Sequence, residues 1–415
     1  MERQAVNSSI SNSEQLPTHR RIFLRIFLTV LIGMGVAMGI VRGFTEALGV
    51  NAQGLLWLGH VLEAQEGLKR LLVEDEGDLV MVYGSSLIAA GFGPREFDQH
   101  IADSGGQSSS WNFGFCCLNP LFQELIARRI VDDFKASDRR LKLLLIEFNP
   151  FQTTKTRRNR AVAVEETFIS LLASREEIVD RVLDDPASGL RIAEIRYLRD
   201  GVSAEAITTF FLSRPFTQPR ADLDPGLEED EAVEERFDEI RDLRRQMFKE
   251  EFPEFAECNW CYDRKGGGVL PSERSEELTA LLSEYFSLKQ SDYQMAIDRL
   301  HRIRTADIEE LYFDEDLVAA FIEMVKVLAQ VSDNIEVIML PKNDDWIMNP
   351  PEALQRLNTV ITRIENETGV TVRNFQKIDA VTNDMFSDTT HLNGLVGREA
   401  FTLFLAEEYG HLFRD

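Results

Sequence analysis

The chain has 415 residues and a formal net charge of −25 at neutral pH. This excess of carboxylates argues against a nucleic-acid-binding surface, because the neutralisation of phosphates needs clustered lysine and arginine. A hydrophobic content of 44% and a charged content of 28% are ordinary for a globular protein, and the length allows one or two domains. The composition therefore predicts a globular protein without a nucleic-acid partner.

An apolar segment near the N-terminus, residues 22–42, follows a basic cluster around Arg20 and Arg21. Its length suits a helix across a bilayer, which needs about 20 residues. Basic residues favour the cytoplasmic side, so we predict a cytoplasmic tail over residues 1–21 and a single-pass anchor in the inner (cytoplasmic) membrane. The rest of the chain would then be periplasmic or otherwise extracytoplasmic. The alternatives are a cleaved signal peptide, which lacks an Ala-x-Ala site here, and a buried core helix, which the basic flanks disfavour.

Three buried strands alternate with amphipathic helices between residues 43 and 151. The apolar run over 78–83 ends at Gly84, and further apolar runs cover 109–113 and 141–148. Continuous apolar runs that are closed by glycine or proline are typical of central parallel strands. The alternation of such strands with helices predicts the first part of a parallel sheet with helical layers.

The strand pattern stops after the third strand. Residues 152–331 show helical patterns and acidic linkers, which we interpret as a helical insertion that overhangs the C-terminal edge of the sheet. Strands are expected again over 334–340 and 370–375, within a second sheet segment that covers 332–415. The predicted fold class is α/β, with a five-stranded mostly parallel sheet, a large helical insertion and an N-terminal transmembrane helix.

A serine follows the first strand in the turn Gly84-Ser85-Ser86. The carboxyl ends of parallel strands are where open α/β sheets place their ligands, and a serine at a helix start suits a nucleophile. The alternative is a strand-to-helix turn that uses serine as an N-cap.

A D-x-x-H step, Asp388 and His391, precedes the last predicted helix. At this spacing the carboxylate can hold one ring nitrogen, which leaves the other nitrogen to take a proton from a serine. Because right-handed crossovers bring the loops after parallel strands to one edge, we predict that Ser86, His391 and Asp388 form one hydrogen-bonded chain.

With these motifs the chain resembles the SGNH/GDSL hydrolase superfamily, over most of residues 77–150 and 333–415. The first block, G-S-S, makes Ser86 the nucleophile, and S-D-T-T-H-L-N supplies Asp388 and His391. The resemblance implies a flavodoxin-like three-layer sandwich. It also implies an oxyanion hole made of Ser86, Gly114 in W-N-F-G and Asn149 in E-F-N-P.

The sequence departs from the family pattern in two blocks. Ser85 stands where the commonest first block has Asp, and the third block lacks the leading Gly and the following Asp. Asn149 is alternatively a cap before Pro150, and Gly114 is alternatively a glycine at a strand end. G-S-S first blocks, a leading transmembrane helix and D-x-x-H-L-N endings are found in membrane-anchored members similar to the teichoic-acid D-alanine transfer proteins and the alginate O-acetyltransferases.

That resemblance implies a serine esterase or O-acyltransferase that acts on acyl esters of cell-envelope or exopolysaccharide polymers. The partners implied are an acylated polysaccharide or other envelope polymer, the membrane, and a membrane-bound acyl donor protein as a further candidate. The alternative function is that of a binding or assembly protein with the same fold and a decayed site.

The remaining candidates for chemistry are four cysteines and one glycine-rich stretch. Cys116 and Cys117 are adjacent, and Cys258 and Cys261 form a C-x-x-C. In an exported domain a structural disulfide is the first expectation, ahead of a four-cysteine zinc site. The glycines in 265–269 lack the Lys-Ser/Thr of a phosphate-binding loop. We therefore predict no cofactor and no metal.

Overall fold

A computed structural model of the chain describes residues 15–47, 64, 66–73, 77–115, 118–199, 231–253, 273–299 and 308–414.

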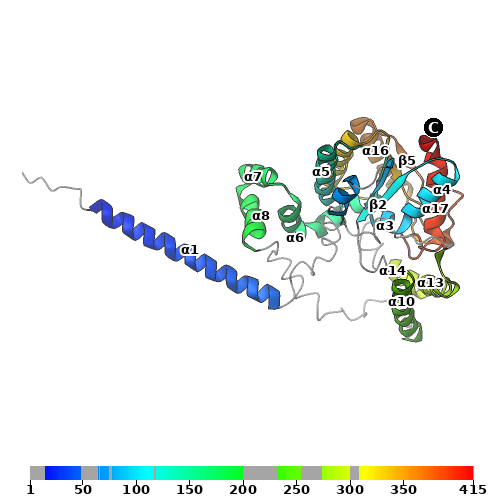
Figure 1. Cartoon of the computed structure of the whole chain (residues 1–415), viewed down its shortest axis with the longest axis horizontal. Coiled ribbons are helices and arrows are strands. Elements are labelled where there is room, and N and C mark those ends of the chain that lie inside the picture. The colour runs from blue at the N-terminus through cyan, green and yellow to red at the C-terminus, as the bar shows by residue number, and fades with distance from the viewer. Residues whose placement is uncertain are drawn as a thin grey trace, which may run out of the picture.

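One five-stranded sheet forms the centre of the molecule, and all of its neighbouring strands run parallel (Figure 1). The strand order is β2-β1-β3-β4-β5, so the chain moves to one side of β1 and then to the other. Five strands were predicted at these places in the sequence, and all five are confirmed. They are β1 (Leu79–Ser85), β2 (Ser109–Phe115), β3 (Leu143–Glu147), β4 (Ile335–Met339) and β5 (Val372–Asn374).

Helices cover both faces of the sheet because successive side chains of a buried strand point to opposite sides. Leu144 and Ile146 of β3 belong to a core with α5, α15 and α16, whereas Leu143 and Leu145 belong to a core with α3, α4 and α17. One layer therefore consists of α5 (Pro120–Ser137), α15 (Glu315–Leu328) and α16 (Pro351–Thr368), and the other of α3 (Ser86–Gly91), α4 (Pro94–Asp103) and α17 (Gly397–Tyr409).

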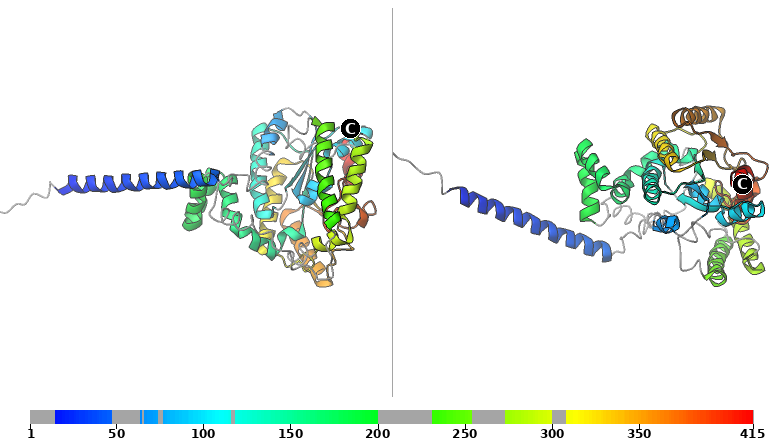
Figure 2. Two further views of the ribbon diagram at one scale, coloured as in Figure 1. Left: turned by 90° about the horizontal axis from the view of Figure 1, so that it is seen from below. Right: turned by 45° about the horizontal axis from the view of Figure 1, so that its top comes forward.

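The region between β3 and β4 is mainly helical where the structure describes it, as predicted. A first group packs beside α5, where the rings of Phe122 and Phe168 stack at 4.1 Å. A second group lies on another side of the sheet domain (Figures 1 and 2). The first group is α6 (Lys155–Leu172), α7 (Arg175–Asp184) and α8 (Pro186–Leu198); the second is α10 (Glu231–Glu251), α13 (Glu276–Lys289) and α14 (Asp292–Asp298).

Helix α15 lies within the range 152–331 that we predicted as the insertion, yet it belongs to a sheet layer. Its residues Phe321, Ile322 and Val325 are buried in the core that includes Ile146 of β3. The sheet domain therefore resumes before residue 331. Short 3₁₀ turns complete the chain, namely Pro150–Thr153, Ala329–Val331, Asn383–Met385 and Gly410–Phe413.

The N-terminal apolar segment forms the long helix α1 (Gln15–Ala47), which projects from the rest of the molecule (Figure 2). The stretch Arg20–Ile40 is long and apolar enough to cross a membrane, and none of it is buried inside the protein. The helix begins at Gln15, so residues 15–21, which we predicted as part of a polar tail, are helical. The amphipathic helix that we expect between the membrane segment and β1 lies partly outside the described residues, and residues 66–73 are helical.

Candidate active site

Ser86 is the first residue of α3 and directly follows β1. Ser85 serves as the N-cap, because its Oγ accepts a hydrogen bond from the Leu87 N–H at 3.2 Å. The capping serine and the candidate nucleophile are therefore two different residues. This division leaves the Ser86 hydroxyl available at the C-terminal edge of the sheet.

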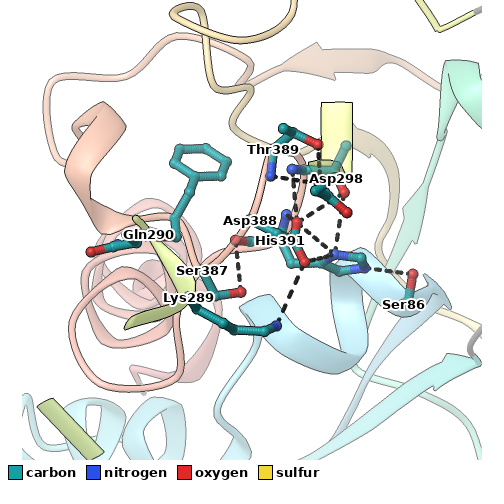
Figure 3. Close-up of polar contacts among 10 residues, drawn as sticks. Ser86, Lys289, Gln290, Asp298, Ser387, Asp388, Thr389 and His391 are labelled. Atoms are coloured by element: carbon teal, nitrogen blue, oxygen red, sulfur yellow. Dashed lines mark hydrogen bonds and ion pairs between the residues drawn. The ribbon is translucent and has the colours of Figure 1, made fainter. Parts of the chain in front are cut away.

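The structure brings together the three residues of the predicted chain (Figure 3). The Ser86 Oγ lies 2.8 Å from Nε2 of His391, and Nδ1 of the same ring lies 2.9 Å from Oδ2 of Asp388. These are hydrogen-bond distances for a nucleophile, a general base and a carboxylate that orients the base. The arrangement allows the imidazole to take the proton of Ser86 while Asp388 holds the other ring nitrogen.

The Asp388 side chain also builds the loop that carries His391. Its Oδ1 accepts hydrogen bonds from the backbone N–H groups of Thr390 and His391, at 2.9 and 2.8 Å. Aspartate favours such turns because its short side chain reaches the backbone two or three residues ahead. The loop is closed at its base by the Ser387 N–H, which donates to the His391 carbonyl at 2.7 Å.

Two helices of the second insertion group contact this loop from outside the sheet domain (Figure 3). Asp298 of α14 accepts hydrogen bonds from the N–H of Thr389, at 3.0 Å, and from its hydroxyl. Lys289 of α13 places its Nζ 3.8 Å from the Asp388 carboxylate. Residues far from the loop in the sequence therefore help to fix its conformation. No sequence motif indicated these contacts.

Asn149 is buried beside the turn and has the capping role that one of our two interpretations predicted, whereas its role in an oxyanion hole stays a prediction. Its Oδ1 accepts the Phe151 N–H at 2.9 Å, which makes it a cap, and its Nδ2 donates to the Ser85 Oγ at 3.0 Å. The two bonds fix the orientation of the amide. The capping interpretation and the interpretation as a residue of the Ser86 site are therefore compatible.

Gly114 is the next-to-last residue of β2, as expected from the interpretation that it is a glycine at a strand end. It pairs with Gly84 inside the sheet, and its N–H donates to the Asn112 Oδ1 at 2.9 Å. A Cβ at residue 114 would lie 2.2 Å from the backbone nitrogen of Ala89 in α3. The glycine therefore permits close packing between β2 and α3, and its N–H is directed to a partner within its own strand.

The sequence reasoning missed Glu147, the last residue of β3. Its Oε2 accepts the Ser85 N–H at 2.6 Å, and its Oε1 accepts the Ser85 hydroxyl at 2.9 Å. Burial raises the pKa of this carboxyl to about 7, although hydrogen bonds from Ser85 and Asn149 act in the opposite direction. An acidic residue at the end of the apolar strand L-L-L-I-E was the available signal.

The Glu147 side chain leaves no room for a Cβ at residue 84, so this residue has to be glycine. A Cβ at residue 84 would lie 2.3 Å from the Glu147 Oε2 and 2.6 Å from its Cβ. The close approach of the two strand ends therefore depends on a residue without a side chain.

A small pocket lies at the ends of β3 and β4. Its wall is mainly apolar, and its polar members include Asn149, Glu147 and Lys342. The pocket is lined by Leu87, Glu147, Phe148, Asn149, Pro150, Phe151, Met339, Leu340, Pro341, Lys342, Ile347, Gln376 and Thr390. Leu87 and Thr390 adjoin Ser86 and His391 in the chain, so the pocket reaches the immediate chain neighbours of both.

The described residues contain no group of three or more His, Cys, Asp or Glu side chains that could hold a metal ion. The predictions about Cys116, Cys117, Cys258 and Cys261 fall outside the described part of the chain.

The chain matches no protein-family model, and no curated protein is significantly similar to it. Its chemistry must therefore be argued from the site. That site contains a serine, an imidazole and a carboxylate in hydrogen-bond contact, next to a fixed amide and a small pocket.

Proposed function

We propose that this protein is a membrane-anchored, extracytoplasmic serine esterase or O-acyltransferase. The observation that carries the proposal is the hydrogen-bonded chain from Ser86 through His391 to Asp388. A serine in contact with a carboxylate-oriented imidazole is the arrangement that activates a hydroxyl for attack on an ester carbonyl.

In the first half-reaction the Ser86 Oγ attacks the carbonyl carbon of the ester, and its proton passes to Nε2 of His391. The proposed donors to the negative carbonyl oxygen are the Ser86 N–H and the Asn149 amide, whose Nδ2 carries a second hydrogen besides the one bonded to the Ser85 Oγ. When the carbon–oxygen bond to the alcohol breaks, His391 returns the proton to the leaving oxygen. The product is an acyl-serine and a free alcohol.

In the second half-reaction His391 removes a proton from water or from an acceptor hydroxyl, whose oxygen attacks the acyl-serine. Collapse of the second intermediate returns the proton to Ser86 and releases an acid or a new ester. Asp388 stabilises the imidazolium in both halves, because it lies within 3.0 Å of Nδ1 through both of its oxygens.

We further infer that the sheet domain is a flavodoxin-like sandwich of the SGNH/GDSL type. Its strand order, 2-1-3-4-5, is the flavodoxin order, in which ligands bind where the order reverses, outside the ends of β1 and β3. Ser86 follows β1, and Asn149 follows β3. In this proposal Gly114 contributes through packing.

The proposed substrates are acyl esters of a cell-envelope polymer or exopolysaccharide. The helix α1 supports a location at the cytoplasmic membrane, because Arg20–Ile40 suits a membrane span. A membrane-bound acyl donor protein would be the partner if the reaction is a transfer.

A second candidate function is that of a binding or assembly protein with an inactive site. It is favoured by the Gly114 N–H, which is bonded to Asn112, since the predicted oxyanion hole then has one donor fewer.

A serine-reactive fluorophosphonate probe distinguishes the two functions, because it labels only an activated serine. We expect the full-length protein in detergent to be labelled, the Ser86→Ala variant to remain unlabelled, and Ser104→Ala to be labelled like the wild type. Ser104 is an exposed serine at the end of α4 and thus a matched control. Absence of labelling in the wild type would favour the binding protein.

A further inference from the structure

The buried carboxylate of Glu147 is in contact with the turn that presents the nucleophile. Ser85 donates to it twice, once from its N–H and once from its hydroxyl. The Ser85 Oγ in turn accepts hydrogen bonds from the Leu87 N–H and the Asn149 amide. Glu147 therefore fixes the direction of the Ser85 hydroxyl, and this hydroxyl orients the amide beside Ser86.

The two departures from the family pattern meet in this contact. Ser85 stands where the commonest first block has a carboxylate, and Glu147 stands where the third block has glycine. The acid that is missing from β1 is supplied by the adjacent strand β3, and the two residues are hydrogen-bonded.

A buried carboxylate is costly unless its hydrogen bonds offset the loss of water. Glu147 is 2% exposed, and Gly84 leaves the space that its carboxylate occupies. A neutral residue would avoid the cost of burying a charge. An acidic residue at this buried place, in hydrogen-bond contact with the nucleophile turn, therefore points to a role in positioning the site.

We propose that Glu147 is a positioning residue, which holds the Ser85–Ser86 turn and the Asn149 amide in the geometry that acyl transfer at Ser86 requires. The inference rests on the proposed function. The ionised carboxylate only accepts hydrogen bonds, so it directs the Ser85 hydroxyl proton towards itself and leaves the oxygen lone pairs to Asn149 and Leu87. Protonation would add a donor to this network and disturb the Asn149 contact.

Other charged or titratable groups around Glu147 are already paired. Tyr83 of β1 points to the opposite face, where its hydroxyl donates to the Gln123 carbonyl. Charged groups on neighbouring elements also have partners among the described residues. Lys342, which shares the pocket, pairs with Asp344, and His391 bonds Ser86. Glu336 of β4 accepts from Tyr409, and Arg398 of α17 pairs with Glu96.

The test compares fluorophosphonate labelling rates of the full-length wild type and of Glu147→Gln between pH 5.5 and 8.5. Glutamine resembles the protonated acid, since it carries one acceptor oxygen and a donor group. We expect similar rates at pH 5.5 and a wild type that is about tenfold faster at pH 8.5, because only the ionised form orients the amide. Glu336→Gln, which removes a carboxylate from the same face of β4, should follow the wild type at every pH.

A double-mutant cycle with Ser85→Ala separates positioning from a general loss of structure. Without the Ser85 hydroxyl, the Glu147→Gln substitution should have a smaller effect on the labelling rate, because the part of the contact with Asn149 that runs through this hydroxyl is absent. Thermal unfolding checks that each variant is folded; if Glu147→Gln does not fold, Ser85→Ala alone must reproduce the slower labelling at pH 8.5.

The outcomes separate the two proposals. A wild type that is not labelled contradicts the proposed function, and the inference falls with it. If the wild type is labelled and Glu147→Gln is labelled at the same rate, the inference is overturned and the proposed function stays intact. The same holds if the ratio of the wild-type rate to the Glu147→Gln rate does not change with pH. Additive effects of the Ser85 and Glu147 substitutions would also overturn it.

Discussion

Nε2 of His391 lies 2.8 Å from the Ser86 Oγ, although 305 positions separate the two residues in the chain. They meet because the loop after β1 and the loop after β5 both leave the C-terminal edge of one parallel sheet. The contact places the nucleophile and its base within hydrogen-bond distance, as proton transfer from Ser86 to His391 requires.

The first prediction concerns the relative importance of His391 and Asp388. His391→Ala removes the only base in contact with Ser86 among the described residues, and we expect labelling to slow by about 10⁴-fold or more. Asp388→Asn should slow labelling by a factor about 100-fold smaller than His391→Ala does. An amide oxygen at this position can still accept hydrogen bonds from the N–H groups of Thr390 and His391. Rates of fluorophosphonate labelling measure both effects.

The matched control for the first prediction is His411→Ala, which changes an exposed histidine in the C-terminal turn. It should leave the labelling rate unchanged. An Asp388→Asn variant that is slower than His391→Ala would contradict our interpretation, since it would mean that the loop depends on the carboxylate more than the chemistry depends on the base.

The second prediction concerns the contact between the insertion and the site. Asp298→Ala removes the acceptor of the Thr389 N–H and hydroxyl, so the loop that carries Asp388 and His391 loses its support from α14. We expect about a tenfold slower labelling of Ser86, an effect typical of residues that position others rather than react. The Glu277→Gln variant, at an exposed position of α13, should match the wild type. Equal labelling rates in Asp298→Ala and the wild type would show that the contact between α14 and this loop does not position the site.

The strands and the Ser–His–Asp chain could be predicted because their signals are local. The run that ends at Gly84 shows both a buried strand and its end, and Asp388 and His391 are three residues apart. Alternation of strands with helices then determines the edge at which these loops meet. The predicted strands lie within about two residues of β1 to β5.

The contacts that were missed depend on packing between distant parts of the chain. The bond between Glu147 and Ser85 follows from the register of β3 against β1, which no local pattern encodes. The bond between Asp298 and Thr389 joins residues that are 91 positions apart. Gly114 was assigned a role from a motif, whereas its neighbour Ala89 is seen only in the fold.

The third prediction concerns membrane topology. The basic residues Arg20, Arg21 and Arg25 lie at the start of the apolar helix, so the N-terminus should stay in the cytoplasm. Alkaline phosphatase fused after residue 77 should therefore be active, since it folds only outside the cytoplasm. Replacement of the three arginines by glutamine should reduce that activity. A cytoplasmic reporter that is active at the same fusion point would reverse the topology and place the site inside the cell.

The fourth prediction links the buried Glu147 to stability. Burial raises its pKa from 4.5 to about 7, so the folded protein binds this proton more tightly than the unfolded chain does. The free energy of unfolding must then fall as the pH rises from about 4.5 to about 7, and this carboxyl adds no further change above that range. The shift corresponds to a loss of about 3 kcal/mol.

Glu147→Gln removes this titration while it keeps the size of the side chain. The free energy of unfolding of the variant minus that of the wild type should therefore rise by about 3 kcal/mol when the pH is raised from 4.5 to 8. Urea unfolding of both full-length proteins in detergent, at the two pH values, measures the difference, and the contributions of all other groups cancel in the comparison. A difference that is the same at both pH values would mean that Glu147 ionises in the folded protein as it does in the unfolded chain. A gain in stability at pH 8 together with slower labelling of Ser86 would show that the charge is retained for the site and at the expense of the fold.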